Sequence, residues 1–126
     1  MNGIDFFVDT NVLIYMLLGE HPTAVKIAQY DFSIGISVIT EIELLGKKNI
    51  SPHDVNVIRS LLNDCIIIPL NADIKEIAIS LKQKYSIKTP DAIIAATAKS
   101  FNMQLLTFDK DFKKIEDEDI VILDLI

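Results

Sequence analysis

The chain has 126 residues, of which 50% are hydrophobic and 24% charged, and its formal net charge is −6. The length indicates a single domain over residues 1–126, and the composition excludes a disordered chain. The acidic balance counts against a protein that binds nucleic acid only through a basic surface. It still allows an acidic site whose charge is covered by divalent cations.

The sequence predicts a cytoplasmic protein without a membrane span. Its longest apolar runs, such as residues 65–70, fall far short of the roughly 20 residues that a membrane helix needs. The N-terminus lacks a basic segment followed by an apolar core, so we expect no signal peptide. Cys65 is the only cysteine, which rules out an internal disulfide and fits a reducing compartment. We expect Cys65 to be a small buried side chain.

Short apolar runs alternate with helical patterns along the chain. In chain order, we expect a strand at 4–8, a helix at 9–18 ended by Gly19, a helix starting near Pro22, a strand at 33–37, a helix at 38–48, a helix at 52–63 capped by Ser51, a strand at 66–68, a helix at 72–85 capped by Asn71, a helix from the Thr89-Pro90 cap to about residue 100, and strands at 104–107 and 120–123. Apolar strands separated by helices indicate an α/β fold with a parallel sheet covered on both faces. Sites in such sheets form outside the carboxyl ends of the strands, where the strand order reverses.

Asp9 ends the first expected strand and opens the first expected helix. Asp is a preferred N-cap residue, so the simplest interpretation is structural, and a ligand role is the alternative. Thr10 and Asn11 are either capping neighbours or residues that hydrogen-bond the acids of a site.

Asp91 lies in the first turn of a helix that is apolar on almost every side. The helix dipole favours a carboxylate there by about 0.3–1 kcal/mol, which is a structural explanation. At about 100° per residue, however, Asp91 shares a face with Ile94, Ala95 and Ala98. A carboxylate on a buried face must be paired, hydrogen-bonded or bound to metal, so this pattern favours a functional role.

The remaining candidate acids are ambiguous on sequence alone. Asp109 and Asp111 follow the fourth strand, where Asp is a common turn former, and Thr107 has the same ambiguity. Glu41 and Glu43 flank the apolar face of the helix at 38–48 almost symmetrically, so periodicity does not choose between them. A solvated helix edge is the default for both. No Cys or His cluster indicates zinc, and no glycine-rich phosphate loop is present.

If the first and fourth strands are neighbours, Asp9, Asp91 and Asp109 converge at one edge of the sheet. Repulsion among these carboxylates is costly unless protons or cations compensate it. Magnesium suits such a site because it takes hard oxygen ligands, retains waters and reaches substrate phosphates. The sequence therefore predicts a magnesium site built from distant segments.

Four motifs follow one another over essentially the whole chain. They are FVDTNVLI at residues 7–14, SVITEIEL at 37–44, TPDAIIAA at 89–96 and LLTFDKDF at 105–112. In this order and spacing they resemble the PIN domain, specifically the VapC-type toxins of bacterial and archaeal toxin–antitoxin pairs. The family's pattern Ser-x-x-Thr-x-x-Glu-Leu falls on Glu43 in the second motif and leaves Glu41 outside it.

The resemblance implies a three-layer PIN-like fold with a five-stranded parallel sheet flanked by helices. It also implies an endoribonuclease that cleaves single-stranded or loop RNA with Mg²⁺ or Mn²⁺, forms homodimers and pairs with a small inhibitory antitoxin. The catalytic and metal-binding residues that it implies are Asp9, Glu43, Asp91 and Asp109. The supporting residues are Thr10, Asn11, Thr107 and Asp111, and the choice between Asp109 and Asp111 as the fourth acid stays open. The lysines expected to guide RNA past an acidic protein are Lys47, Lys48, Lys84, Lys88 and Lys110.

Three other functions fit parts of the pattern. A phosphoacceptor signalling domain also has a five-stranded parallel sheet and binds Mg²⁺, but it needs an acceptor Asp at the end of the third strand. This chain has Ile68-Pro69-Leu70 there. A non-catalytic PIN-like module that binds only RNA or protein is disfavoured by the complete set of acids. A PIN nuclease of RNA maturation or decay, without an antitoxin, stays open.

Overall fold

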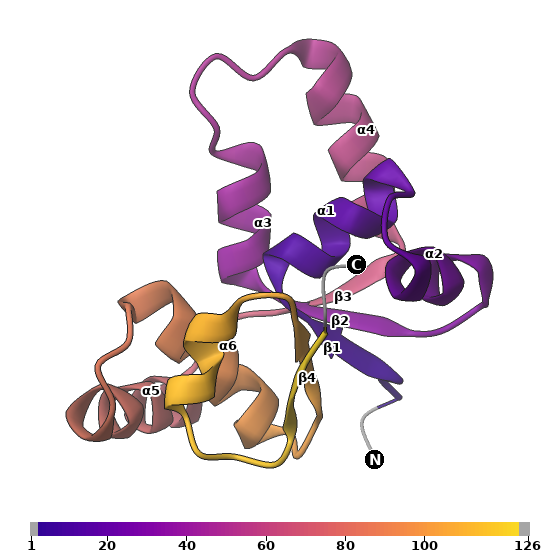
Figure 1. The fold of residues 1–126 in the computed structure, drawn as a ribbon. Helices are drawn as coiled ribbons and strands as arrows, with labels where there is room; N and C mark the ends of the chain where they lie inside the picture. Colours follow the sequence, from indigo (N-terminus) through magenta and orange to yellow (C-terminus); the bar gives the residue numbers. More distant parts are fainter. Residues whose placement is uncertain (1–2, 124–126) are drawn as a thin grey trace.

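The fold is built on five parallel strands in the order β3-β2-β1-β4-β5 (Figure 1). A computed structural model describes residues 3–123 of the chain. The strands are β1 (Phe6–Val8), β2 (Ile34–Ser37), β3 (Cys65–Ile68), β4 (Leu105–Thr107) and β5 (Ile120–Ile122). The predicted five-stranded parallel sheet is confirmed, and the first and fourth strands are neighbours.

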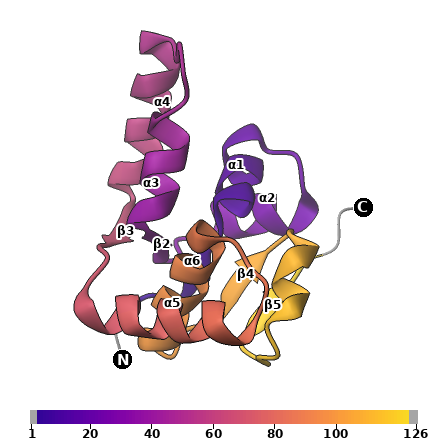
Figure 2. The same cartoon turned by 90° about the vertical axis from the view of Figure 1, so that its left-hand side faces the viewer.

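Helices cover both faces of the sheet, which gives the expected three layers (Figures 1 and 2). They are α1 (Thr10–Leu18), α2 (Pro22–Gln29), α3 (Val38–Leu45), α4 (Pro52–Asn63), α5 (Ala72–Lys84) and α6 (Thr89–Ser100), with a 3₁₀ helix η1 (Lys110–Lys114). Both views show α3 and α4 side by side, projecting away from the sheet as a pair. In the part of the chain described, no helix is long and apolar enough to span a membrane.

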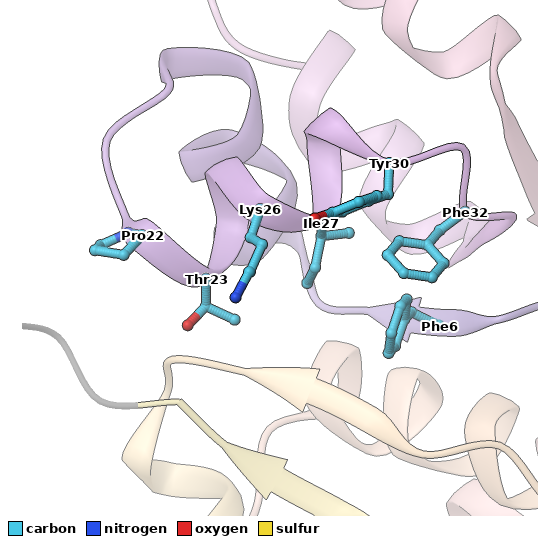
Figure 3. Close-up of a pocket in the computed structure, with 7 residues that line it drawn as sticks. All are labelled: Phe6, Pro22, Thr23, Lys26, Ile27, Tyr30 and Phe32. Atoms are coloured by element: carbon cyan, nitrogen blue, oxygen red, sulfur yellow. The ribbon is translucent and has the colours of Figure 1, made fainter.

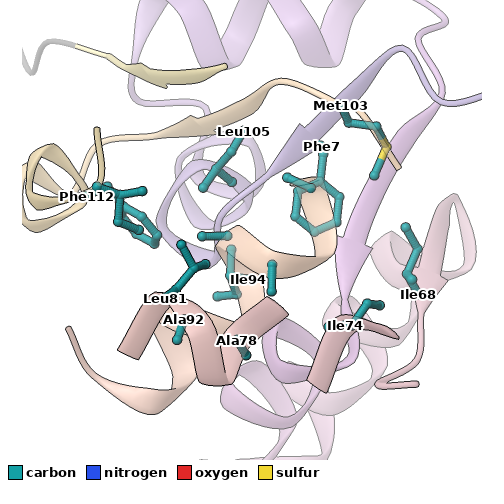
Figure 4. Close-up of a cluster of buried hydrophobic side chains, with 14 residues drawn as sticks. Phe7, Ile68, Ile74, Ala78, Leu81, Ala92, Ile94, Met103, Leu105 and Phe112 are labelled. Atoms are coloured by element: carbon teal, nitrogen blue, oxygen red, sulfur yellow. The ribbon is translucent and has the colours of Figure 1, made fainter. Parts of the chain in front are cut away.

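Two hydrophobic cores lie on opposite faces of the sheet, because successive strand residues point to opposite sides. Phe7 of β1 and Leu105 of β4 pack with buried residues of α5 and α6, as Figure 4 shows. The next residues, Val8 and Leu106, point to the other face and pack against α1 and α2. The strands are therefore apolar on both faces, which is why they read as continuous apolar runs.

Several element boundaries differ from the sequence expectation. The helix expected to reach Lys48 ends at Leu45, because Gly46 follows it and Asn49 adopts a left-handed φ of 60°. The helix expected to be capped by Thr89 has Lys88 at its N-cap position, and no side chain caps it. The 3₁₀ helix η1 was not expected at all.

Cys65 is only half-buried at the start of β3, so the expectation of a buried side chain was wrong. Its environment is still apolar enough to affect its chemistry. Burial, with a smaller contribution from the charge of Asp64, raises the pKa of the Cys65 thiol to about 11. A thiol with this pKa is protonated at neutral pH and unreactive, which agrees with a structural role.

The core assignment can be tested with one substitution made at two phenylalanines. Phe7 is 0% exposed and Phe32 is 39% exposed. Phe7→Ala should lower the free energy of unfolding by about 3–5 kcal/mol because it leaves a cavity. Phe32→Ala should lower the free energy of unfolding by about 1 kcal/mol, mainly because it removes the edge-on contact with Phe6. Urea unfolding followed by circular dichroism measures both, and equal losses would contradict this core.

Candidate active site

The strand order reverses between β1 and β4, and acidic residues follow both strands. β1 leads through β2 to β3 on one side, whereas β4 and β5 lie on the other side. The Asp9 amide donates to the carbonyl of Leu106 at 2.9 Å, so Asp9 lies directly beside the end of β4. In α/β proteins, ligands bind outside the carboxyl ends of strands at such a reversal.

Asp9 is a buried carboxylate held in a fixed orientation. It is 5% exposed, and it is the N-cap of α1. Its Oδ1 accepts from the Thr10 amide at 2.8 Å, and its Oδ2 accepts from the Thr107 hydroxyl at 2.7 Å. Burial raises the pKa of Asp9, the hydrogen bonds from Thr107 and Thr10 lower it, and the charges of Glu43 and Asp109 raise it further. The cap interpretation is therefore correct but incomplete, because capping alone does not require neighbouring acids.

A chain of hydroxyl groups connects α1 to α3. The Thr10 hydroxyl donates to Glu43 Oε1 at 2.7 Å and lies 2.9 Å from the Thr40 hydroxyl. Because Thr10 has one hydroxyl proton, Thr40 must be the donor in the second bond. Thr40 is fully buried, and it is a member of the site that was not expected from the sequence. Its position in the second motif, three residues before Glu43, was the available signal.

Glu43, and not Glu41, belongs to the group of acids. The charge of Glu43 raises the pKa of both Asp9 and Asp91. Glu41 contributes to neither shift, although it lies in the same helix. The structure thus makes the choice that periodicity left open, and it agrees with the resemblance.

Asp91 is half-buried in the first turn of α6 and carries the clearest electrostatic perturbation of the site. Burial, followed by the charges of Asp9, Asp109 and Glu43, raises the pKa of Asp91 from 3.8 to about 6, against an opposing effect of Lys88. Ile94, Ala95 and Ala98 of the same helix are buried, as the sequence predicted. Asp91 therefore faces the other three acids at a buried edge.

The segment after β4 brings Asp109 to the site and places Asp111 beside it. The Asp109 amide donates to the Thr107 hydroxyl at 3.0 Å, and Asp109 Oδ1 accepts from the Asp111 amide at 2.9 Å. Asp109 is half-buried, whereas Asp111 is exposed. The Asn11 side chain accepts from the Phe108 amide at 3.2 Å, so it fixes this segment rather than contacting an acid. Asp109 is thus the fourth member of the electrostatic group.

We call Asp9, Glu43, Asp91 and Asp109 the acid site. Within residues 3–123, none of its carboxylates forms an ion pair with a basic side chain. In the same range, no three Asp, Glu, His or Cys side chains are close enough to enclose a metal ion by themselves. The donors are all oxygens, and they suit a cation that takes one or two carboxylates and completes its shell with water, as Mg²⁺ does.

A separate hollow of about 450 Å³ lies at the amino end of β1, away from the acids (Figure 3). Its lining is largely apolar and aromatic and consists of Phe6, Pro22, Thr23, Lys26, Ile27, Tyr30 and Phe32. Lys26 is the only charged residue in this lining, and it contains no acid. This hollow therefore offers a hydrophobic surface but no groups for hydrolytic chemistry.

Comparisons with known proteins agree with this geometry. The sequence model of the PIN domain matches residues 6–118. Ribonuclease VapC6 of Methanocaldococcus jannaschii is 24% identical, over 96% of this chain and 99% of that protein, and Ribonuclease VapC2 of the same organism is 26% identical over 91% of each. A chain in the structure of a toxin–antitoxin complex from Klebsiella pneumoniae is 32% identical with a TM-score of 0.79, covering 96% of this chain and 100% of that chain.

The family match extends over most of the chain and includes strands β1 to β4 and all four residues of the acid site. With this match and the Klebsiella pneumoniae relative, the chain belongs to the PIN domain family.

Proposed function

We propose that this protein is an endoribonuclease that depends on a divalent cation and acts as the toxin of a toxin–antitoxin pair. One observation carries the proposal: acids from four separate segments meet, the charges of Glu43 and Asp109 raise the pKa of both Asp9 and Asp91, and no basic side chain in the described range forms an ion pair with them. The relatives support the chemistry and the role, because two are named ribonucleases and another was solved in a toxin–antitoxin complex.

The acid site fits a hard divalent cation such as Mg²⁺ or Mn²⁺. Asp9, Glu43, Asp91 and Asp109 would supply its one or two direct carboxylate ligands and hold the rest of its shell through water, because these side chains offer only carboxylate oxygens. The hydrogen bonds from Thr10 and Thr107 occupy one position on each oxygen of Asp9, so further lone pairs are available. When bound, a divalent cation lowers the pKa of a coordinated water and offsets charge on the phosphate.

The side chains of this chain would orient the reactants for hydrolysis of a phosphodiester. Attack of water in line with the leaving oxygen would give a 5′-phosphate and a 3′-hydroxyl. Glu43 or Asp109 would orient the water and accept its proton. Glu43 is exposed, and the Thr10 hydroxyl fixes one of its oxygens, so its other oxygen can face the substrate. Single-stranded RNA is the proposed substrate, because its phosphates and bases are accessible outside a duplex.

Asp9→Asn and Asp91→Asn should each reduce Mg²⁺-dependent RNA cleavage by at least about 100-fold, because each removes a charge that the cation needs. Asp73→Asn is the matched control, because Asp73 is an exposed acid in the first turn of α5. Cleavage of a labelled single-stranded RNA, with and without chelator, measures the effect. An Asp91→Asn protein that cuts as fast as the wild type would remove Asp91 from the site.

The raised pKa of Asp91 predicts how the stability of the metal-free protein depends on pH. The folded state binds a proton at Asp91 more tightly than the unfolded state, so stability should rise as the pH falls from above 6 toward 4. After allowance for solvent screening, the effect is on the order of 1 kcal/mol. Differential scanning fluorimetry in chelator should show a higher Tm at pH 5 than at pH 7.5.

The same measurement has two internal controls. Mg²⁺ should raise the Tm at pH 7.5, because a ligand that binds only the folded state stabilises it. Asp91→Asn should raise the Tm in chelator at pH 7.5 and reduce the pH dependence. A wild-type Tm that falls between pH 7.5 and 5 while Asp91→Asn behaves identically would refute the proposed charge repulsion.

The proposed antitoxin partner has a suitable surface next to the acid site. A groove of about 340 Å³ lies between α1, α3 and α4, and Glu43 is part of its lining. Leu18 in this groove is 58% exposed, and Ile14, Leu17 and Val57 are also exposed. Contiguous exposed apolar side chains mark protein interaction sites. A segment of the antitoxin bound in this groove would therefore lie beside Glu43 and block access to the acids.

Leu18→Asp should preserve RNA cleavage but weaken inhibition by the antitoxin, because it puts a charge into an apolar contact. Leu70→Asp is the control, since Leu70 is 48% exposed and lies outside the groove. The protein encoded by the neighbouring reading frame serves as inhibitor, and cleavage is titrated against its concentration. If that protein inhibits neither variant nor the wild type, the toxin proposal fails, and a nuclease of RNA maturation or decay becomes the better proposal.

The homodimer stays a prediction. Light scattering of the purified protein, which measures its molar mass in solution, tests it.

A further inference from the structure

A second hollow, of about 310 Å³, adjoins the acid site. Its lining consists of Ser86, Ile87, Lys88, Asp91, Asp111 and Lys114. Asp91 thus belongs both to this hollow and to the acid site. The volume is at the lower end of the roughly 300–1,000 Å³ of ligand pockets, and the mostly charged and polar lining suits a small charged group. We call it the Lys88–Lys114 hollow.

Two ammonium groups reach this hollow from separate segments. Lys88 directly precedes α6, and Lys114 is the last residue of η1. Lys114 Nζ donates to the carbonyl of Ser86 at 3.3 Å, which fixes η1 against the loop between α5 and α6. Across residues 3–123, neither lysine is paired with a carboxylate. Because an ammonium group has three donors, both lysines keep donors for a ligand.

We propose that the Lys88–Lys114 hollow binds a backbone phosphate of the RNA strand, adjacent to the phosphodiester that is cleaved. This inference rests on the proposed ribonuclease function. It predicts that the RNA strand runs from the acid site toward η1 and the loop between α5 and α6. Lysine binds phosphate as a flexible point charge, so two lysines from different segments can close on one phosphate. Since Asp91 forms a wall common to both sites, the two phosphates would belong to neighbouring parts of one strand.

The charges of the hollow link phosphate binding to the acid site. Two lysines and two aspartates line it, so its net charge is zero when all four are ionised. A cation held by Asp91 would offset one of the carboxylates and leave the hollow positive. Lys88 is already close enough to act on Asp91, because its charge lowers the pKa of that carboxyl against the surrounding acids. Phosphate binding should therefore be stronger with Mg²⁺ than without it.

The test compares Lys88→Gln with Lys99→Gln, because Lys99 is an exposed lysine near the opposite end of α6. Binding of a fluorescent single-stranded RNA is followed by anisotropy in chelator, where metal-dependent cleavage does not consume it. Lys88→Gln should reduce the slope of log affinity against log salt by about 0.7 for one lost phosphate contact. Lys99→Gln should keep the wild-type slope, and Lys88→Arg should restore most of it.

Kinetics with Mg²⁺ separate substrate binding from chemistry. Lys88→Gln should raise KM about fivefold with little change in kcat, because the contact is equally present before and during the reaction. Lys114→Gln should act in the same direction. That variant also loses the bond to Ser86, so its Tm is measured alongside. Within residues 3–123 the Lys88 side chain forms no hydrogen bond of this kind, so Lys88→Gln is the variant that decides the question.

The outcomes distinguish this inference from the proposed function. Equal salt slopes and equal KM values for Lys88→Gln and Lys99→Gln would overturn the phosphate site while leaving RNA cleavage intact. If instead the wild-type protein cuts no RNA with Mg²⁺, the ribonuclease proposal fails. The anisotropy measurements in chelator would then still decide whether this hollow holds an RNA phosphate.

Discussion

The arrangement of the site depends on one unfavourable interaction, the crowding of carboxylates around a buried aspartate. Asp9 is 5% exposed and lies within electrostatic reach of Glu43 and Asp109, while Asp91 interacts with all three. Burial and like charges both disfavour ionisation, so a proton or a cation must compensate. The rest of the fold holds these groups together despite their repulsion. The two hydrophobic cores supply the stability, since neither contains an acid of the site.

Hydrogen bonds hold Asp9, Glu43 and Asp109 in place before any ligand arrives. Backbone pairing of β1 with β4 sets the position of Asp9, and the hydroxyl of Thr107 bridges from Asp9 to the amide of Asp109. On the other side, Thr10 connects the start of α1 to Glu43 on α3. Such supporting bonds orient metal-binding and catalytic side chains and reduce the reorganisation needed for reaction. Two threonines thus organise most of the site without carrying charge.

The sequence was most informative where one physical pattern had one structural solution. Apolar strands between helices led to the parallel sheet, and acids after strands led to its carboxyl edge. Three features lacked such a signal. Glu41 and Glu43 flank the same apolar face, so periodicity does not separate them; the contact of Glu43 with Thr10 and its effect on the pKa of Asp9 and Asp91 do. Thr40 is indistinguishable by periodicity from an ordinary buried helix residue, and Lys114 lies in a five-residue 3₁₀ helix too short to have a recognisable period.

The strand order also determines when the acid site forms. β4 comes late in the chain but inserts beside β1 in the middle of the sheet, and 98 positions separate Thr107 from Asp9. A nascent polypeptide emerging from the ribosome therefore exposes its first acids long before their partners have been synthesised. Pairing over such a sequence separation is also among the slower steps of folding. The proposed cleavage of RNA is consequently withheld during translation and can begin only after β4 has been made and has paired with β1.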